Sequence, residues 1–298
     1  MILNGALRRL DIRTLVRHTH LFFLEKKTTM KDSFYALITG ALVLASVNVF
    51  AQARGAGAPG GQRGAAPQAP PTPKAMAPFD ITGYWVSEIT EDWKWRMFPA
   101  KGDYAGLPLN PEGKRVADTW DPAKDEATGE QCKGYGAPTI MRNPGRFHIT
   151  WADDQTLKIE TDAGTQTRML YFGNPQGQGG DWQGISKAEW DPGPQANAGF
   201  GGGGRGRGNG PIPGSLKVVT TKMKPGYIRR NGVPYSANAV LTEWYDFIKE
   251  DNGDIYLVQT QEVNDSMYLT DIYTTAVHFK KQADATGFRP APCASKQF

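Results

Sequence analysis

Four polar side chains of the sequence could carry out acid–base chemistry if a β-sheet brought them together. They lie in segments rich in strand-forming residues and are His148, Arg168, Glu243 and His278. A histidine can exchange a proton near neutral pH, and an arginine can polarise a carbonyl or a carboxylate. Together these side chains would suit a lyase, isomerase or hydrolase site. The alternative is that these side chains form the solvated face of a sheet.

Aromatic side chains suggest a second kind of site, one that binds a flat ligand. Trp93 and Trp95 are two residues apart, so in a strand they would share a face and could stack on a ligand. Trp85 and Tyr245 are further candidates for ligand contact. The alternative is that Trp93 and Trp95 pack in the core or cover one end of the fold, and that Trp85 anchors the first strand.

Metal and cofactor motifs are absent from the sequence. His148 and His278 are about 130 residues apart, without a HxH, HxxxH or CxxC pattern. The segment Asp251–Asp254 lacks the later acidic ligands of a calcium loop, so it predicts a hairpin turn. There is no GxGxxG after a strand, no P-loop and no GxSxG elbow. We therefore predict neither a metal site nor a cofactor.

The elements that must position these side chains are predicted to be strands. The segment Arg146–Trp151 alternates, with Phe147, Ile149 and Trp151 on one face. Similar strand-forming segments recur along the chain and are separated by turns. They are residues 80–89, 146–151, 156–161, 165–172, 182–190, 215–223, 239–248, 254–263 and 272–281.

Turn and helix signals complete the predicted fold. Asn252-Gly253 predicts a tight hairpin, and Asn231-Gly232 is a candidate turn of a smaller ribbon. Leu109–Asp121 predicts one short helix, within a long loop over residues 96–145. Consecutive strands with hairpin turns predict an all-β domain over residues 79–298, as one antiparallel β-barrel or closed sandwich. Closure removes the open edges that would invite aggregation.

The N-terminal region predicts export. Residues 30–53 read as a secretory signal peptide, because Lys31 precedes an uncharged apolar run and Ala51–Ala53 is a small-x-small cleavage site. Cys132 and Cys293 are the two cysteines, and an even number in an exported chain favours a disulfide between them. The alternative is two separate thiols. We expect a periplasmic or extracellular protein, without stable membrane insertion after cleavage.

Residues 1–29 precede a good start methionine, Met30, and we interpret them as an over-extended gene start or a long leader. Residues 1–53 hold seven of the 34 Lys and Arg residues and three of the 30 Asp and Glu residues, so the remaining chain is formally neutral. A neutral exported chain lacks the basic surface of a nucleic-acid-binding protein. We therefore expect no nucleic-acid partner.

Two low-complexity segments flank or interrupt the predicted barrel. Residues 54–78 are rich in Gly, Ala and Pro, and we expect them to be disordered. Residues 192–214 contain the run GFGGGGRGRGNGP. In a cytosolic protein that run would suggest an RNA-binding arm. In this chain we interpret it as a solvated insertion between two strands, because export removes access to RNA.

Two resemblances bear on the fold. Gly83-Tyr84-Trp85 resembles the Gly-x-Trp opening motif of lipocalins, which implies a barrel that could hold one small ligand in its mouth. Over about residues 80–293 the chain also resembles a large family of exported bacterial proteins, through segments such as QCKGYGAP, MRNPGRFHITW, TQTRMLYFG and DSMYLTDIYTTAVHFK. This second resemblance implies one exported domain and no particular activity. Many members have a histidine between the glycine and the serine of a Gly-x-Ser strand. In this chain that position is Ile185.

These observations predict an exported protein that binds a small apolar or aromatic molecule in the barrel mouth, under the 96–145 loop. The first alternative is an enzyme that uses the four polar residues in the same barrel. The second is a cell-envelope interaction protein without a cavity. A cavity lined by the polar residues would favour the enzyme, an aromatic cavity would favour binding, and a filled interior would favour the interaction protein.

Overall fold

The computed structural model describes residues 69–97, 99–192 and 214–295. These residues lie in one unit of the chain, Ala65–Phe298. Several sequence predictions fall on residues outside the described ranges. They are the leader extension (1–29), the signal peptide (30–53), the linker up to residue 68 and residues 193–213 of the Gly/Arg insertion.

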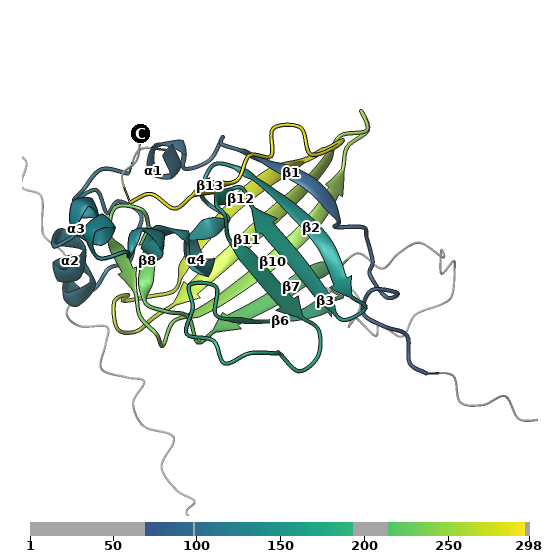
Figure 1. Ribbon diagram of the computed structural model, residues 1–298, viewed down its shortest axis with the longest axis horizontal. Helices are drawn as coiled ribbons and strands as arrows, with labels where there is room; N and C mark the ends of the chain where they lie inside the picture. Colours follow the sequence, from purple (N-terminus) through teal and green to yellow (C-terminus); the bar gives the residue numbers. More distant parts are fainter. Residues whose placement is uncertain (1–68, 98, 193–213, 296–298) are drawn as a thin grey trace, which may run out of the picture. The chain divides into compact units, whose positions relative to one another are not determined.

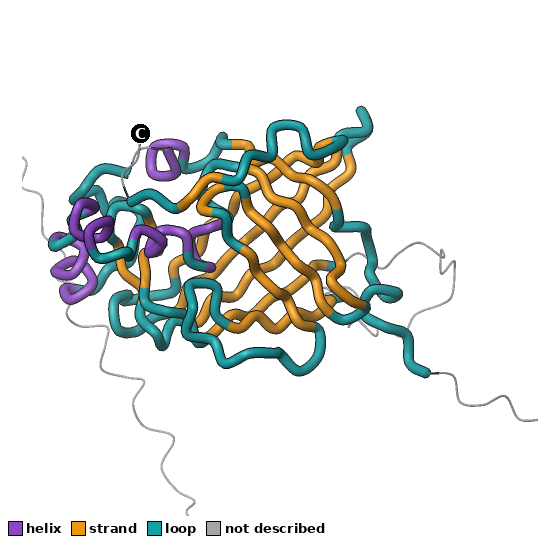
Figure 2. Tube along the Cα trace, in the orientation of Figure 1, coloured by secondary structure: helices purple, strands orange, loops and turns teal. Residues whose placement is uncertain are grey.

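Nine of the described strands close into a barrel (Figure 1, Figure 2). Around the barrel they are β1 (Gly83–Glu88), β12 (Tyr273–Gln282), β11 (Ile255–Asn264), β10 (Val240–Lys249), β7 (Ser215–Thr221), β6 (Ile185–Asp191), β5 (Thr167–Tyr171), β3 (Thr156–Thr161) and β2 (Arg146–Asp153). β2 pairs again with β1, which closes the ring. The all-β barrel prediction is confirmed, with one correction: β5 and β6 pair in parallel, whereas the other neighbours are antiparallel.

Every second side chain of a barrel strand points inward, and these side chains fill the barrel. In β10, Leu241, Glu243 and Tyr245 are buried and alternate with half-buried residues. Successive strand residues point to opposite faces, so these three point inward. The predicted hairpin after β10 is present as well, since Gly253 has a φ of 88° and Asn252 accepts a hydrogen bond from the Asp254 amide at 2.8 Å.

Two small two-stranded sheets stand beside the barrel. The predicted ribbon is present as β8 (Gly226–Arg229) and β9 (Val233–Tyr235), which pair in antiparallel fashion. The second sheet joins β4 (Ala163–Gly164) to β13 (Ala291–Pro292) in parallel, and so fixes the C-terminal segment beside the barrel.

Short helices occupy most of the predicted 96–145 loop. They are α2 (Pro111–Asp118), α3 (Pro122–Ala127), the 3₁₀-helix η2 (Gln131–Tyr135) and α4 (Ala137–Ile140). α2 is the one helix that the sequence predicted, and its N-cap Asn110 accepts a hydrogen bond from the Gly113 amide at 2.8 Å. The sequence therefore predicted fewer helices than this segment contains.

A further helix, α1 (Trp93–Met97), corrects the expectation for the paired tryptophans. Trp93 and Trp95 lie on this helix and not on a strand. Residues two apart on a helix point in different directions, so the two rings do not share a face. Trp93 is 58% exposed, and the Trp95 ring lies 5.2 Å from the Arg229 guanidinium.

The two ends of the barrel are closed differently. At the end that we call the cap end, Ile140 and Met141 enter the barrel core, and Gln261 donates a hydrogen bond to the Pro138 carbonyl at 2.9 Å. At the opposite end, aromatic rings pack together, and Phe79 stacks on Phe247 with ring centroids 5.2 Å apart.

The chain before β1 also packs on this aromatic end. The indole of Trp190 donates a hydrogen bond to the Pro73 carbonyl at 2.8 Å, and the Lys74 amide donates to the Asp154 carbonyl at 3.2 Å. The disorder predicted for residues 54–78 therefore does not extend over its last residues, and the folded chain begins before Phe79.

Candidate functional site

A sealed polar network occupies the barrel interior. Arg168 of β5 and Glu243 of β10 form an ion pair whose two side chains have no exposed area. The Arg168 guanidinium donates to both carboxylate oxygens, at 2.9 and 2.5 Å. The Tyr245 hydroxyl and the Gln259 amide donate to the same carboxylate at 2.9 and 2.8 Å. Burial would lower the pKa of Arg168, but the charges and hydrogen bonds of Glu243 and Tyr245 together outweigh burial and raise it.

Large side chains fill the space around this network. Trp85 and Tyr245 have no exposed area, and Phe279 is 1% exposed. A cavity wide enough for water would leave accessible area on the side chains around it, so these rings pack directly against their neighbours. The interior therefore offers no room for a ligand, and Trp85 and Tyr245 are part of the packed core.

The two candidate histidines lie on the outer face of the barrel. His148 follows the buried Phe147 in β2 and stacks on Tyr84, with ring centroids 4.0 Å apart. Burial lowers the pKa of His148. His278 precedes the buried Phe279 in β12.

Carboxylates flank His278 on both sides. Its Nε2 lies 3.3 Å from Glu88, and its Nδ1 lies 3.0 Å from Glu91. The structure thus brings Arg168 and Glu243 together inside the barrel, and it leaves both histidines on the other side of the barrel wall. The four polar candidates do not form one site.

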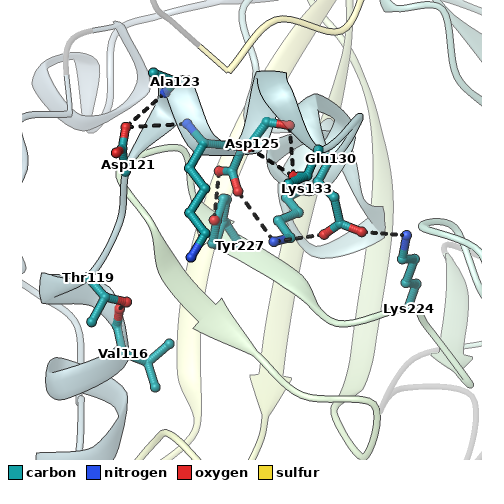
Figure 3. A network of polar contacts seen from close by, with 11 residues as sticks. Val116, Thr119, Asp121, Ala123, Asp125, Glu130, Lys133, Lys224 and Tyr227 are labelled. Atoms are coloured by element: carbon teal, nitrogen blue, oxygen red, sulfur yellow. Dashed lines mark hydrogen bonds and ion pairs between the residues drawn. The ribbon is translucent and has the colours of Figure 1, made fainter.

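A cleft of about 240 Å³ opens at the cap end, between the short helices and the β8–β9 ribbon (Figure 3). We call it the cap cleft. Four aromatic residues line it, and they are Trp120, Tyr227, Tyr235 and Tyr268. Four charged residues also line it, and they are Asp121, Lys124, Asp125 and Lys133. Aromatic walls with a few polar groups are typical of small-molecule sites.

Local sequence signals build the walls of the cap cleft. Asp121 accepts hydrogen bonds from the amides of Ala123 and Lys124 at 3.0 and 3.4 Å, and so caps α3. Gly232 in the ribbon turn has a φ of 88°, and a Cβ there would lie 2.1 Å from Trp120. Only glycine lets the ribbon approach Trp120 this closely.

A chain of polar contacts runs along one side of the cleft (Figure 3). The Tyr227 hydroxyl donates a hydrogen bond to Asp125 at 2.8 Å. The Lys133 ammonium lies 3.3 Å from the other oxygen of Asp125 and 2.7 Å from Glu130. The Lys224 ammonium lies 3.0 Å from Glu130. Carboxylates and ammonium groups therefore alternate in this chain, which begins at the lining residues and continues beyond the cleft to Glu130 and Lys224.

The pKa shifts of Tyr227, Lys133 and Glu130 keep these three groups in their usual charge states. Burial and the hydrogen bond to Asp125 raise the pKa of Tyr227. Burial would lower the pKa of Lys133, but its contacts with Glu130 and Asp125 raise it. Hydrogen bonds from the two lysines lower the pKa of Glu130. Proton transfer favours groups with a pKa near the working pH. The shifts in this chain move the three pKa values further from neutral pH. The arrangement suits binding better than acid–base chemistry.

The disulfide between Cys132 and Cys293 fixes the C-terminal segment beside the cleft, and it confirms the predicted pairing. The Ser295 amide donates a hydrogen bond to Glu126 of α3 at 2.7 Å. Ala294 and Ser295 also help to enclose a chamber of about 10 Å³, which shares lining residues with the cap cleft. The disulfide thus supports the base of the cleft.

Sequence reasoning did not select the residues of the cap cleft. One signal could have found α3, because Asp121-Pro122 repeats the Asn110-Pro111 pattern that marks the start of α2. A second signal is the position of Lys133 directly after Cys132. No single-chain pattern joins these residues to Tyr227, which reaches them through the ribbon.

Comparison with family models, curated proteins and solved structures gives no match to this chain. The lipocalin-like opening motif and the resemblance to exported bacterial proteins therefore stay predictions. Among the described residues, no helix is long and apolar enough to cross a membrane. The same residues contain no group of three or more His, Cys, Asp or Glu side chains that could hold a metal ion.

Proposed function

We propose that this protein binds a small molecule with an aromatic ring in the cap cleft. The observation that carries the proposal is the presence of four aromatic residues around a cleft of about 240 Å³. Drug-sized ligands occupy pockets of about 300–1,000 Å³, so this cleft suits a smaller molecule. The cleft lies between the 96–145 segment and the β8–β9 ribbon, and none of the described barrel strands lines it, so the proposed site differs from the one expected in the barrel mouth. The ligand would bind outside the packed interior.

Export is a second part of this proposal. The signal peptide predicted over residues 30–53 supports it. The Cys132–Cys293 disulfide also supports it, because such bonds persist mainly in oxidising compartments. N-terminal sequencing of the protein from the periplasm or culture medium tests this, and we expect a mature start at Arg54. A protein found only in the cytoplasm with residues 30–53 intact would refute export.

Native mass spectrometry of the mature protein, purified from its own host, tests the binding. We expect a co-purified small molecule. Thr119 lines the cleft and is exposed, so Thr119→Trp should fill the cleft and remove the additional mass without unfolding the protein. Lys114→Trp adds the same ring to an exposed residue of α2 outside the lining, and should keep the ligand.

A second candidate function is an interaction protein of the cell envelope. The filled barrel interior favours it, because the fold then needs no ligand to complete its core. In that case no small molecule should co-purify, and Thr119→Trp and Lys114→Trp should behave alike. The same mass-spectrometry experiment therefore separates the two candidates.

A further inference from the structure

We infer that the ligand of the cap cleft is a small aromatic carboxylate, with its ring between the aromatic walls and its carboxylate on Lys124. This inference rests on the proposed function and names the ligand class of the same site. It follows from the hydrogen-bonding groups that the cleft leaves unused, and from its size.

Most of the carboxylate oxygens that line the cleft already accept hydrogen bonds from the protein. Both carboxylate oxygens of Asp125 have partners, Tyr227 on one and Lys133 on the other. One oxygen of Asp121 accepts from two backbone amides at the start of α3. A ligand that mainly offers hydrogen-bond donors would therefore compete with contacts that already exist.

The donors of the cleft are in surplus. An ammonium group has three N–H donors, and Lys133 directs its group at two carboxylates, so one donor remains. Lys124 lines the cleft, and its ammonium has no partner among the residues that the structure describes. A ligand that brings acceptors, and above all a negative charge, complements this surplus.

The shape of the cleft restricts the ligand further. Trp120, Tyr227 and Tyr268 are half-buried and supply ring faces and edges for a planar ligand, whereas Tyr235 is buried in the wall behind them. A volume of about 240 Å³ equals that of roughly eight water molecules, at ~30 Å³ each, and suits one ring with short substituents. The aliphatic stem of Lys124 can cover the ring while its ammonium reaches the carboxylate.

Calorimetric titration with two probes of equal size tests the inference. The probes are 4-hydroxybenzoate and its neutral amide, 4-hydroxybenzamide. We expect the mature protein to bind the carboxylate about tenfold more tightly, because a hydrogen bond to a charged group is stronger than one to a neutral group. The preference should decrease as salt is added, since Lys124 is exposed.

Two charge-matched variants assign this preference to Lys124. Lys124→Gln should reduce the preference for the carboxylate to less than about twofold, since it removes the ammonium but keeps most of the stem. Lys114→Gln removes the same charge from an exposed residue of α2 outside the lining, and should keep the preference.

The outcomes separate this inference from the function on which it rests. Equal binding of both probes would overturn the carboxylate inference and leave aromatic binding in place. A preference that survives in Lys124→Gln would overturn the role of Lys124. Failure of both probes to bind at millimolar concentration, in a protein that also carries no co-purified molecule, would overturn the inference and the proposed function together.

Discussion

The barrel interior and the cap cleft contain the same three kinds of side chain in contact. Inside the barrel, Glu243 pairs with Arg168 and accepts a hydrogen bond from Tyr245. At the cap, Asp125 contacts Lys133 and accepts a hydrogen bond from Tyr227. The difference is exposure: both charged side chains are 0% exposed in the interior pair, whereas Lys133 is 27% exposed.

This difference indicates what each trio can do. In the interior, Glu243 receives its partners from within the barrel and no solvent reaches it, so the trio can only stabilise the fold. At the cap, Lys133 is partly exposed and lines an open cleft. The same chemistry is therefore structural where it is sealed, and available to a ligand where it is partly open.

The largest predicted effect concerns the interior carboxylate. Glu243→Gln leaves Arg168 as a buried charge without its counter-ion, and should reduce the free energy of unfolding by about 3–5 kcal/mol. Asp125→Asn should cost only about 1 kcal/mol, since Lys133 keeps its contact with Glu130. Denaturant unfolding measures both changes.

A surface carboxylate provides the control for this measurement. Glu189 pairs with Lys217 at 3.1 Å but is 57% exposed, so Glu189→Gln should change stability by less than about 0.5 kcal/mol. If Glu243→Gln and Asp125→Asn cost the same, exposure does not distinguish the two trios, and the comparison is wrong.

The next largest effect concerns the disulfide. The bond joins residues 161 positions apart, so its removal in Cys132→Ser/Cys293→Ser should cost about 2–4 kcal/mol. Amide hydrogen exchange should increase first in the segment Ala291–Ser295 and in η2, and little in the barrel strands. A free-thiol count on denatured, unreduced protein provides the control. Two free thiols in the wild type would contradict the bond itself.

The strands could be predicted because each one carries its own signal. Arg146–Trp151 alternates over its whole length, and the structure places β2 there. The sequence could not predict which face of each strand points into the barrel. Arg168 shares the buried face of β5 with Leu170, because its charge finds a partner across the barrel. The sequence therefore left open whether Arg168 lies inside the barrel or on its solvated face.

The cap cleft could not be predicted for a different reason. α3, which lines it, has only six residues, so periodicity gives this helix almost no signal. Its walls also come from segments that are distant in sequence, since Tyr227 reaches Asp125 across 102 residues. Only the cysteine pairing indicated that the segment near residue 132 meets the C-terminal segment.

The smallest predicted effect is a pH dependence that belongs to the cap alone. The pKa of Glu130 is lowered in the folded protein by Lys133 and Lys224, so its contribution to stability is present above its unfolded pKa. This contribution is lost as the pH falls through the folded value. Glu130→Gln should therefore destabilise the protein by less than about 1 kcal/mol at pH 7, because Glu130 is 28% exposed and solvent screens its ion pairs.

Unfolding curves of wild type and Glu130→Gln between pH 7 and pH 3 test this dependence. The gap between the two proteins should shrink as the pH falls below the unfolded pKa of Glu130, and high salt should reduce it at pH 7. The ion pair of Arg168 and Glu243 is sealed, so added salt should leave the cost of Glu243→Gln almost unchanged. An equal response to salt at both sites would show that solvent reaches the barrel interior as readily as the cap.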